Sequence, residues 1–252
     1  MRNFLGEKLR KREVAFGVLI EEPATQIAEI LGLLGFDYIY IDCQHSPMSI
    51  ESVAQLIKVA ELRGMTPLVR VPQNLPEIIM RYLDVGAMGI IVADMDSVEE
   101  AQKAVNAVKY PPEGQRGLSA TRAADFGLKE SLGDYVKVAN RETMVLGMIE
   151  NREGVERIDE ILGIEGLDGV SIGTTDLSKS LGVPGQRNDP LVLEAINKVI
   201  LAGQKRGKFI AISARRGEKA KPYIEKGFNM ITKSLSALVV EACHQFLEQA
   251  RS

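Results

Sequence analysis

The chain has 252 residues, of which 45% are hydrophobic, 26% charged and 5% aromatic, and its formal net charge is -3. This composition is typical of one ordinary globular domain, and the small negative charge gives no electrostatic reason to expect nucleic-acid binding. No run approaches the roughly 18 apolar residues that span a bilayer, and residues 1–12 lack the apolar core of a signal peptide. The two cysteines, Cys43 and Cys243, suit neither a disulfide framework nor a zinc site, so we expect a cytoplasmic protein.

Short apolar runs alternate with segments of helical periodicity along the chain. The apolar runs, which we interpret as strands, are 14–20, 36–42, 67–71, 89–94, 144–150, 168–173, 209–213 and 229–234. The helical segments are 24–35, 49–64, 75–86, 97–110, 154–163, 175–182 with 191–207, 218–227 and 237–250. Nearly continuous apolar runs are typical of parallel strands buried on both faces. Eight such units in about 250 residues predict a single-domain (β/α)8 TIM barrel over residues 1–252, with a doubly wound open sheet as the alternative.

The segment YPPEGQRGLSATRAADFG, residues 110–127, interrupts this repeat. Long irregular segments in compact domains are usually functional or lid-like. Within it, Arg116 and Arg122 are either ligands for a substrate carboxylate or surface charges.

Polar residues recur where the predicted strands end, which in this fold is the end that carries the active site. The opposite ends read as helix caps and turns. The polar residues at the strand ends are Glu21, Glu22, Asp42, Gln44, His45, Arg70, Asp94, Glu150, Gly173, Thr175, Asp176 and Lys233.

Glu150 and Asp176 follow neighbouring predicted strands, so their carboxylates are expected to converge near the barrel axis. Two carboxylates that leave the other positions to water and ligand suit a hard octahedral cation such as Mg²⁺ or Mn²⁺. The alternative is structural, with Glu150 in a salt bridge and Asp176 as the N-cap of a helix.

Arg70 ends an apolar strand, where a guanidinium needs an anion. The anion is either a substrate carboxylate or enolate, or a structural partner such as Glu150 or Asp94. His45 follows the strand that ends at Asp42, and its near-neutral pKa suits proton transfer, although a lone loop histidine is often only structural. Cys43 alternates to the other face of that strand and is interpreted as packing.

Six ordered pieces of the chain resemble the HpcH/HpaI aldolases of the phosphoenolpyruvate/pyruvate barrel superfamily, from about residue 14 to 233. They are FDYIYIDCQHSP, PLVRVP, LDVGAMGIIV, KYPPEGQRG, VLGMIEN and LDGVSIGTTDLSKSLG. The resemblance implies a (β/α)8 barrel, assembled as a homo-oligomer, a hexamer or trimer with an exchanged C-terminal helix. It also implies metal-dependent cleavage of a 4-hydroxy-2-oxo acid into pyruvate, or a close analogue, and an aldehyde. Mg²⁺ or Mn²⁺ is the expected metal, with Co²⁺ or Zn²⁺ as substitutes.

The resemblance also assigns roles to individual residues of this chain. Glu150 and Asp176 fall on the metal-ligand positions, His45 on the proton acceptor, Arg70 on the arginine that steadies the enolate, and Asp84 on the acid that raises the basicity of the histidine. The amide of Thr175 falls on a contact to the substrate carboxylate. Asp42 completes the expected catalytic set, and Arg70, Met148, Gly173 and Asp176 complete the expected substrate-binding set with Thr175.

Several positions depart from the family pattern. Gln44 stands for the usual glutamate, Met148 for a glutamine that often binds substrate, and Lys233 lies where a small residue and an acid are usual. Lys233 also offers a competing mechanism, a Schiff base with the substrate. Two other functions stay open: a lyase acting on an acyl-CoA thioester, and a non-catalytic regulatory descendant.

Overall fold

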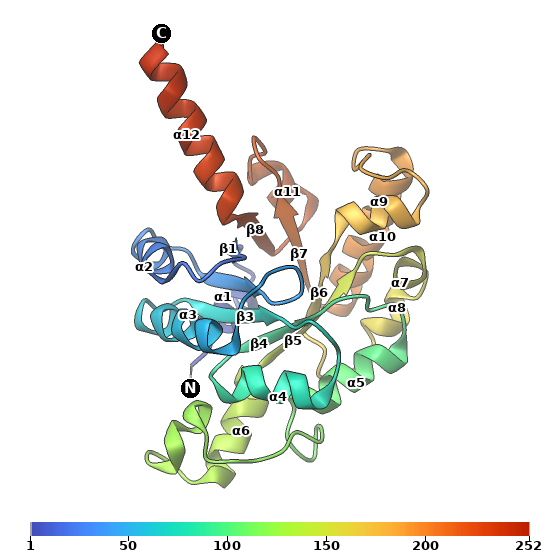
Figure 1. The fold of residues 1–252 in the computed structure, drawn as a ribbon. Coiled ribbons are helices and arrows are strands. Elements are labelled where there is room, and N and C mark those ends of the chain that lie inside the picture. Colours follow the sequence, from blue (N-terminus) through green and yellow to red (C-terminus); the bar gives the residue numbers. More distant parts are fainter. Residues whose placement is uncertain (1, 252) are drawn as a thin grey trace.

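The computed structural model describes residues 2–251. Eight parallel strands form a closed barrel in sequence order, with β8 hydrogen-bonded back to β1 (Figure 1). The strands are β1 (Ala15–Ile20), β2 (Tyr38–Asp42), β3 (Thr66–Arg70), β4 (Gly89–Val92), β5 (Met144–Ile149), β6 (Gly169–Ile172), β7 (Phe209–Ala214) and β8 (Met230–Ser234). The predicted (β/α)8 barrel is therefore confirmed, and the open sheet is excluded because the strand order closes on itself.

Helices cover the outside of the barrel and connect successive strands. They are α1 (Phe4–Arg10), α2 (Thr25–Leu33), α3 (Ile50–Leu62), α4 (Pro76–Asp84), α5 (Val98–Val108), the 3₁₀ segment η1 (Arg122–Gly127), α6 (Leu132–Glu142), α7 (Arg152–Glu156), α8 (Ile158–Ile161), α9 (Thr174–Ser180), α10 (Pro190–Arg206), α11 (Lys221–Lys226) and α12 (Leu235–Arg251). Ser49, Ser97 and Asp189 cap the N-termini of α3, α5 and α10, accepting backbone N–H groups.

Alternate strand residues form two separate cores, because successive side chains of a strand point to opposite faces. Outward-facing residues such as Ile39, Ile41 and Val69 pack against the helices. Inward-facing residues such as Tyr40 and Leu68 fill the barrel. Every position of β2, β4, β5 and β6 is buried, which explains their nearly continuous apolar sequences.

Helix α1, which the repeat did not predict, closes the N-terminal end of the barrel. Its Leu5 and Leu9 are buried in the same cluster as the inward-facing strand residues. The Asn3 side chain caps the helix at Gly6 N (2.8 Å) and donates to the carbonyl of Glu142 (2.7 Å). With this end closed, the C-terminal ends of the strands form the open mouth.

Residues 110–127 do not form a lid over the mouth of their own barrel, contrary to expectation. They connect the end of α5 with α6, which leads into the start of β5, and so lie toward the N-terminal end of the strands. Arg116 donates to the carboxylate of Asp84 (2.9 Å), and Arg122 pairs with Glu61. Both arginines are therefore held by carboxylates of the chain itself.

The last helix, α12, projects away from the barrel (Figure 1). Leu235 at its start is buried, whereas Val239, Phe246 and Leu247 are exposed. Across residues 2–251, no helix combines the length and the hydropathy needed to cross a membrane.

Gly17 offers a test of how tightly β1 packs on β2. A Cβ atom at this position would lie 2.2 Å from the ring of Tyr38, whose hydroxyl is hydrogen-bonded inside the barrel to Thr232 (2.8 Å). We expect Gly17→Ala to lower the free energy of unfolding by about 1–3 kcal/mol, measured by urea denaturation, since a packed core resists added volume. Gly133→Ala is the control, because the nearest atom to its Cβ is 3.8 Å away. Equal stability of the two variants would contradict this account.

Candidate active site

A cavity of about 470 Å³ lies at the mouth of the barrel. It brings together most of the residues predicted from the strand ends. These are Glu21, His45, Arg70, Glu150, Gly173, Thr175 and Asp176, and Met148, which the family resemblance predicted, lies with them. Residues that were not predicted also line it, notably Tyr40, Arg187, Ser213, Arg215, Arg216, Ser234 and Ser236.

Glu150 and Asp176 form the acidic side of this cavity. Glu150 follows β5 and is 8% exposed, while Asp176 lies in the first turn of α9 and has Lys179 Nζ at 3.7 Å. Burial, followed by the charges of Asp94 and Asp176, raises the pKa of Glu150, although the Asp94 N–H that donates to its Oε1 (2.9 Å) opposes this. The two carboxylates therefore repel each other, and a bound cation would relieve the repulsion.

Gly173 makes room for the Glu150 carboxylate. A Cβ atom on Gly173 would lie 2.7 Å from both Cβ and Oε2 of Glu150, and 3.3 Å from Sδ of Met148. No larger residue fits here without moving the glutamate. Gly173 thus acts on the site through the space it leaves.

The acidic pair fits a hard divalent cation better than a soft one. Within residues 2–251, no group of three or more His, Cys, Asp or Glu side chains is arranged to hold a metal ion. Zinc sites usually need such a set of nitrogen or sulfur ligands. Mg²⁺ is commonly held by one or two carboxylates, with water and substrate oxygens in the other positions, and Glu150 with Asp176 match that pattern.

Arg70 is held by Asp42 in a bidentate ion pair. Its Nε donates to Oδ1 (2.9 Å) and its Nη2 to Oδ2 (2.6 Å) of the fully buried Asp42. Burial opposes ionisation of Asp42, but the hydrogen bonds and charge of Arg70 outweigh it and lower the pKa of this carboxyl group. The expected structural partners, Glu150 and Asp94, are replaced by Asp42, which is adjacent to Arg70 in the register of β2 and β3.

One edge of the Arg70 guanidinium stays directed to the cavity. Among residues 2–251, its Nη1 has one hydrogen-bond acceptor, the weakly accepting Sδ of Met148, at 3.6 Å. Asp42 itself does not line the cavity, so it acts by positioning Arg70.

The same carboxylate shapes the loop that carries His45. Asp42 Oδ1 accepts from the backbone N–H of Gln44 (2.9 Å) and of His45 (3.3 Å), and the Ser46 hydroxyl donates to the carbonyl of Asp42. The exposed His45 side chain is placed at the cavity. Burial raises the pKa of Cys43 to about 11, which agrees with its interpretation as packing.

Tyr40 lies two residues before Asp42 and lines the cavity from inside the barrel. Its hydroxyl is buried and, among residues 2–251, has no hydrogen-bond partner. Burial raises its pKa above the ordinary value, so it is a neutral donor. The period-two alternation of strand side chains was the sequence pattern that could have identified it.

Besides Asp42, the predicted residues Asp84 and Lys233 lie outside the cavity. Asp84 is the last residue of α4 and accepts a hydrogen bond from Arg116. It does not line the cavity that contains His45 in the same chain, so its effect on the basicity of the histidine stays a prediction. Lys233 forms an ion pair with Glu241 of α12 (2.7 Å). Its amine is therefore engaged with a carboxylate rather than directed at substrate.

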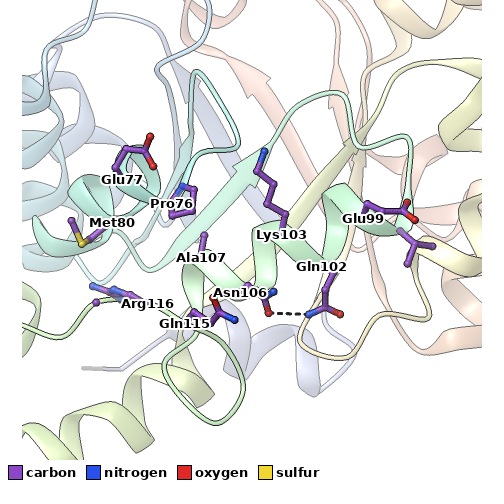
Figure 2. Close-up of a pocket in the computed structure, with 12 residues that line it drawn as sticks. Pro76, Glu77, Met80, Glu99, Gln102, Lys103, Asn106, Ala107, Gln115 and Arg116 are labelled. Atoms are coloured by element: carbon purple, nitrogen blue, oxygen red, sulfur yellow. Dashed lines mark hydrogen bonds between the residues drawn. The ribbon is translucent and has the colours of Figure 1, made fainter.

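A second cavity, of about 830 Å³, lies on the outer surface between α4 and α5 (Figure 2). Pro76 and Met80 line it from one helix, Gln102 and Asn106 from the other, and Arg116 closes one end. None of its lining residues ends a strand of the barrel. The smaller cavity is the better candidate because it gathers the acids, the histidine and the arginine at the strand ends.

The chain matches known proteins over most of its length. A model of the family described as HpcH/HpaI aldolase/citrate lyase matches residues 16–239. A pyruvate aldolase of Rhizobium etli is 38% identical over 199 residues, 79% of this chain and 77% of the relative. A 5-keto-4-deoxy-D-glucarate aldolase of Escherichia coli is 35% identical over 204 residues, 81% of this chain and 78% of the relative. The crystal structure of a family member from Burkholderia cenocepacia covers 99% of this chain and 100% of its own, with a TM-score of 0.93 and 31% identity. This chain therefore belongs to the HpcH/HpaI aldolase/citrate lyase family.

Proposed function

We propose that the protein is a divalent-metal-dependent aldolase that cleaves a 4-hydroxy-2-oxo acid into pyruvate, or a close analogue, and an aldehyde. The observation that carries this proposal is the convergence of Glu150, Asp176, Arg70 and His45 on one cavity. Relatives at 38% and 35% identity are named as aldolases, which supports a carbon-carbon lyase. Absence of metal-dependent proton exchange at C3 of pyruvate would favour the two alternatives, the thioester lyase and the regulatory descendant.

Glu150 and Asp176 would hold the metal ion. Mg²⁺ or Mn²⁺ fits this pair best, and Co²⁺ or Zn²⁺ would substitute. The ion would supply Lewis-acid polarisation of the 2-oxo group of the substrate. The backbone N–H of Thr175, on the same side of the cavity, would bind the substrate carboxylate.

His45 and Arg70 would then carry the proton and charge movements of cleavage. His45 takes the proton of the 4-hydroxyl, the C3–C4 bond breaks, and C4 leaves as the aldehyde. The electron pair of that bond moves to C3 and onto the C2 oxygen, which forms the enolate of pyruvate. The cavity-facing edge of Arg70 stabilises this oxyanion, and return of one proton at C3 completes pyruvate.

We also propose that the protein is a homo-oligomer, a trimer or hexamer. Beyond Leu235, α12 leaves Val239, Phe246 and Leu247 exposed as it projects from the barrel (Figure 1). Helices gain most of their stability by packing an apolar face, so a second copy of the chain is the expected cover. The free thiols of Cys43 and Cys243 suit a reducing compartment, and we propose the cytoplasm.

Proton exchange at C3 of pyruvate tests the function without knowledge of the aldehyde. We expect exchange in heavy water that requires Mn²⁺ or Mg²⁺ and stops with EDTA, because the enolate needs the cation. Borohydride with pyruvate should leave the mass of the protein unchanged, since Lys233 is paired with Glu241. Exchange that persists without metal, or a covalent adduct on Lys233, would replace this mechanism with a Schiff base.

The variant Glu150→Gln tests whether Glu150 binds the metal ion or contributes to the stability of the fold. Because burial raises the folded-state pKa of Glu150, its ionised form destabilises the metal-free protein near neutral pH, a cost that fades as pH falls through that raised pKa. We expect the variant to lose metal-dependent exchange and thermal stabilisation by Mn²⁺, while its metal-free unfolding free energy at pH 7 is unchanged or higher. Glu153→Gln, an exposed acid in the next helix, is the matched control. Full exchange by Glu150→Gln would remove Glu150 from the metal site.

Substitutions of His45 and Arg70 should impair different steps of the reaction. His45→Ala should lower cleavage roughly 100-fold or more, the usual scale of a lost general base, and leave stabilisation by Mn²⁺ intact. Arg70→Lys should lower both cleavage and C3 exchange, because both pass through the enolate and lysine lacks the bidentate fork. Rates per folded molecule are compared after denaturation curves are measured. Unchanged cleavage by His45→Ala would make the histidine a structural loop residue.

A further inference from the structure

One side of the active-site cavity has no role in the proposed mechanism. It is built from the segments that follow β6, β7 and β8, opposite the sector of β3 where Arg70 lies. Its polar lining residues are Arg187, Ser213, Arg215, Arg216, Ser234 and Ser236. The rest of the substrate must extend over this side if the pyruvate unit occupies Arg70 and the acidic pair.

Three guanidinium groups on this side lack a carboxylate partner. Arg187, half-buried, donates through Nη2 to the carbonyl of Ser213 (3.2 Å). Within residues 2–251, neither it nor Arg215 or Arg216 forms an ion pair, although other arginines of the chain do. Burial, followed by the charge of Arg215, lowers the pKa of Arg187, so the two cations lie close enough to repel.

Two acids lie near these guanidinium groups, but neither forms an ion pair with them. Glu241 is within electrostatic range of Arg216 but pairs with Lys233. Glu218 is within electrostatic range of Arg187 and Arg215. Its carboxylate, however, accepts from the backbone N–H of Arg215 (2.7 Å) and from the hydroxyl of Tyr223 (2.5 Å). The guanidinium donors therefore stay available to a ligand.

Hydroxyl groups complete this side of the cavity. Ser236 donates to Ser234, whose oxygen also accepts from the N–H of Ala237 (both 3.2 Å), where α12 begins. The loops after the seventh and eighth strands of (β/α)8 barrels frequently bind phosphate. Four arginines and three carboxylates line the whole cavity, so a divalent cation on Glu150 and Asp176 would leave it clearly positive.

We infer that Arg187, Arg215 and Arg216 form an anion subsite that binds a carboxylate or phosphate on the aldehyde half of the substrate. This inference rests on the proposed function, because it takes the pyruvate half to lie on the acidic side. Guanidinium groups suit both anions, since their planar fork makes two parallel hydrogen bonds to either. An aldehyde with a neutral tail would leave these cations without a counter-charge.

The test is aldol addition of pyruvate, with Mn²⁺, to two matched pairs of aldehydes. The carboxylate pair is 4-oxobutanoate and 4-methylpentanal, in which an isopropyl group replaces the carboxylate at similar size. The phosphate pair is glyceraldehyde 3-phosphate and glyceraldehyde. For at least one pair, we expect kcat/KM to favour the anionic member about 10- to 100-fold, the scale of charge-assisted hydrogen bonds. The pair that shows the preference identifies the anion.

Variants assign the preference to the three arginines. In Arg187→Gln, and in the double variant Arg215→Gln with Arg216→Gln, the ratio of kcat/KM for anionic over neutral aldehyde should fall toward 1. This ratio does not depend on the folded fraction of each preparation, so it can be measured even for a partly unfolded variant. Lys219→Gln, a cation of the same loop that does not line the cavity, should keep the wild-type ratio.

The outcomes separate this inference from the proposed function. If wild-type protein exchanges the C3 protons of pyruvate but shows no anionic preference in either pair, the anion subsite is wrong and the aldolase stands. A preference that survives in both arginine variants also overturns it. If metal-dependent exchange is absent, the proposed function fails and the inference fails with it.

Discussion

The site depends on one buried carboxylate, Asp42. A fully buried and unpaired carboxylate would cost several kcal/mol, so this side chain requires partners wherever the chain places it. It finds them in the guanidinium of Arg70 and in two backbone N–H groups of the following turn. The same four interactions fix the arginine on the next strand and the loop that presents His45. The proposed anion stabiliser and the proposed base are thus both positioned by one carboxylate that does not itself line the cavity.

At the mouth of the barrel, side chains of like charge lie close enough to repel each other. Glu150 follows a strand that is buried at every position, and its carboxylate occupies the space that Gly173 leaves by lacking a Cβ atom. Its raised pKa shows that the metal-free fold holds this charge at a cost. Arg187 and Arg215 repeat the arrangement with opposite sign. In both places a ligand of the opposite charge would relieve the repulsion.

The periodicity of the sequence predicted the barrel because each strand is an uninterrupted apolar run with a polar residue at one end. Helix α1 was not predicted because it precedes the first strand–helix repeat. Helix α6 was not predicted because the irregular residues 110–127 come directly before it and interrupt the repeat. Most of the predicted site was assembled as expected, since strand ends converge by topology. The Arg70–Asp42 pair was missed, although the two residues are register neighbours, because the strand pairing was not known. Arg187 follows β6, whereas Arg215 and Arg216 follow β7, all in loops without a periodic pattern, so only the folded structure shows that they line one cavity.

Two departures from the family pattern, Met148 and Gln44, place neutral side chains next to the Arg70–Asp42 pair. Met148 presents its sulfur to Arg70 Nη1 at 3.6 Å, where an amide oxygen would accept more strongly. Gln44 keeps its backbone hydrogen bond to Asp42, yet its side-chain oxygen is buried without a partner in the described part of the chain. A weak acceptor beside Arg70 leaves more of its hydrogen-bonding capacity for an oxyanion. Of these two residues only Met148 lines the cavity, together with the four residues on which the proposed cleavage depends, Glu150, Asp176, Arg70 and His45.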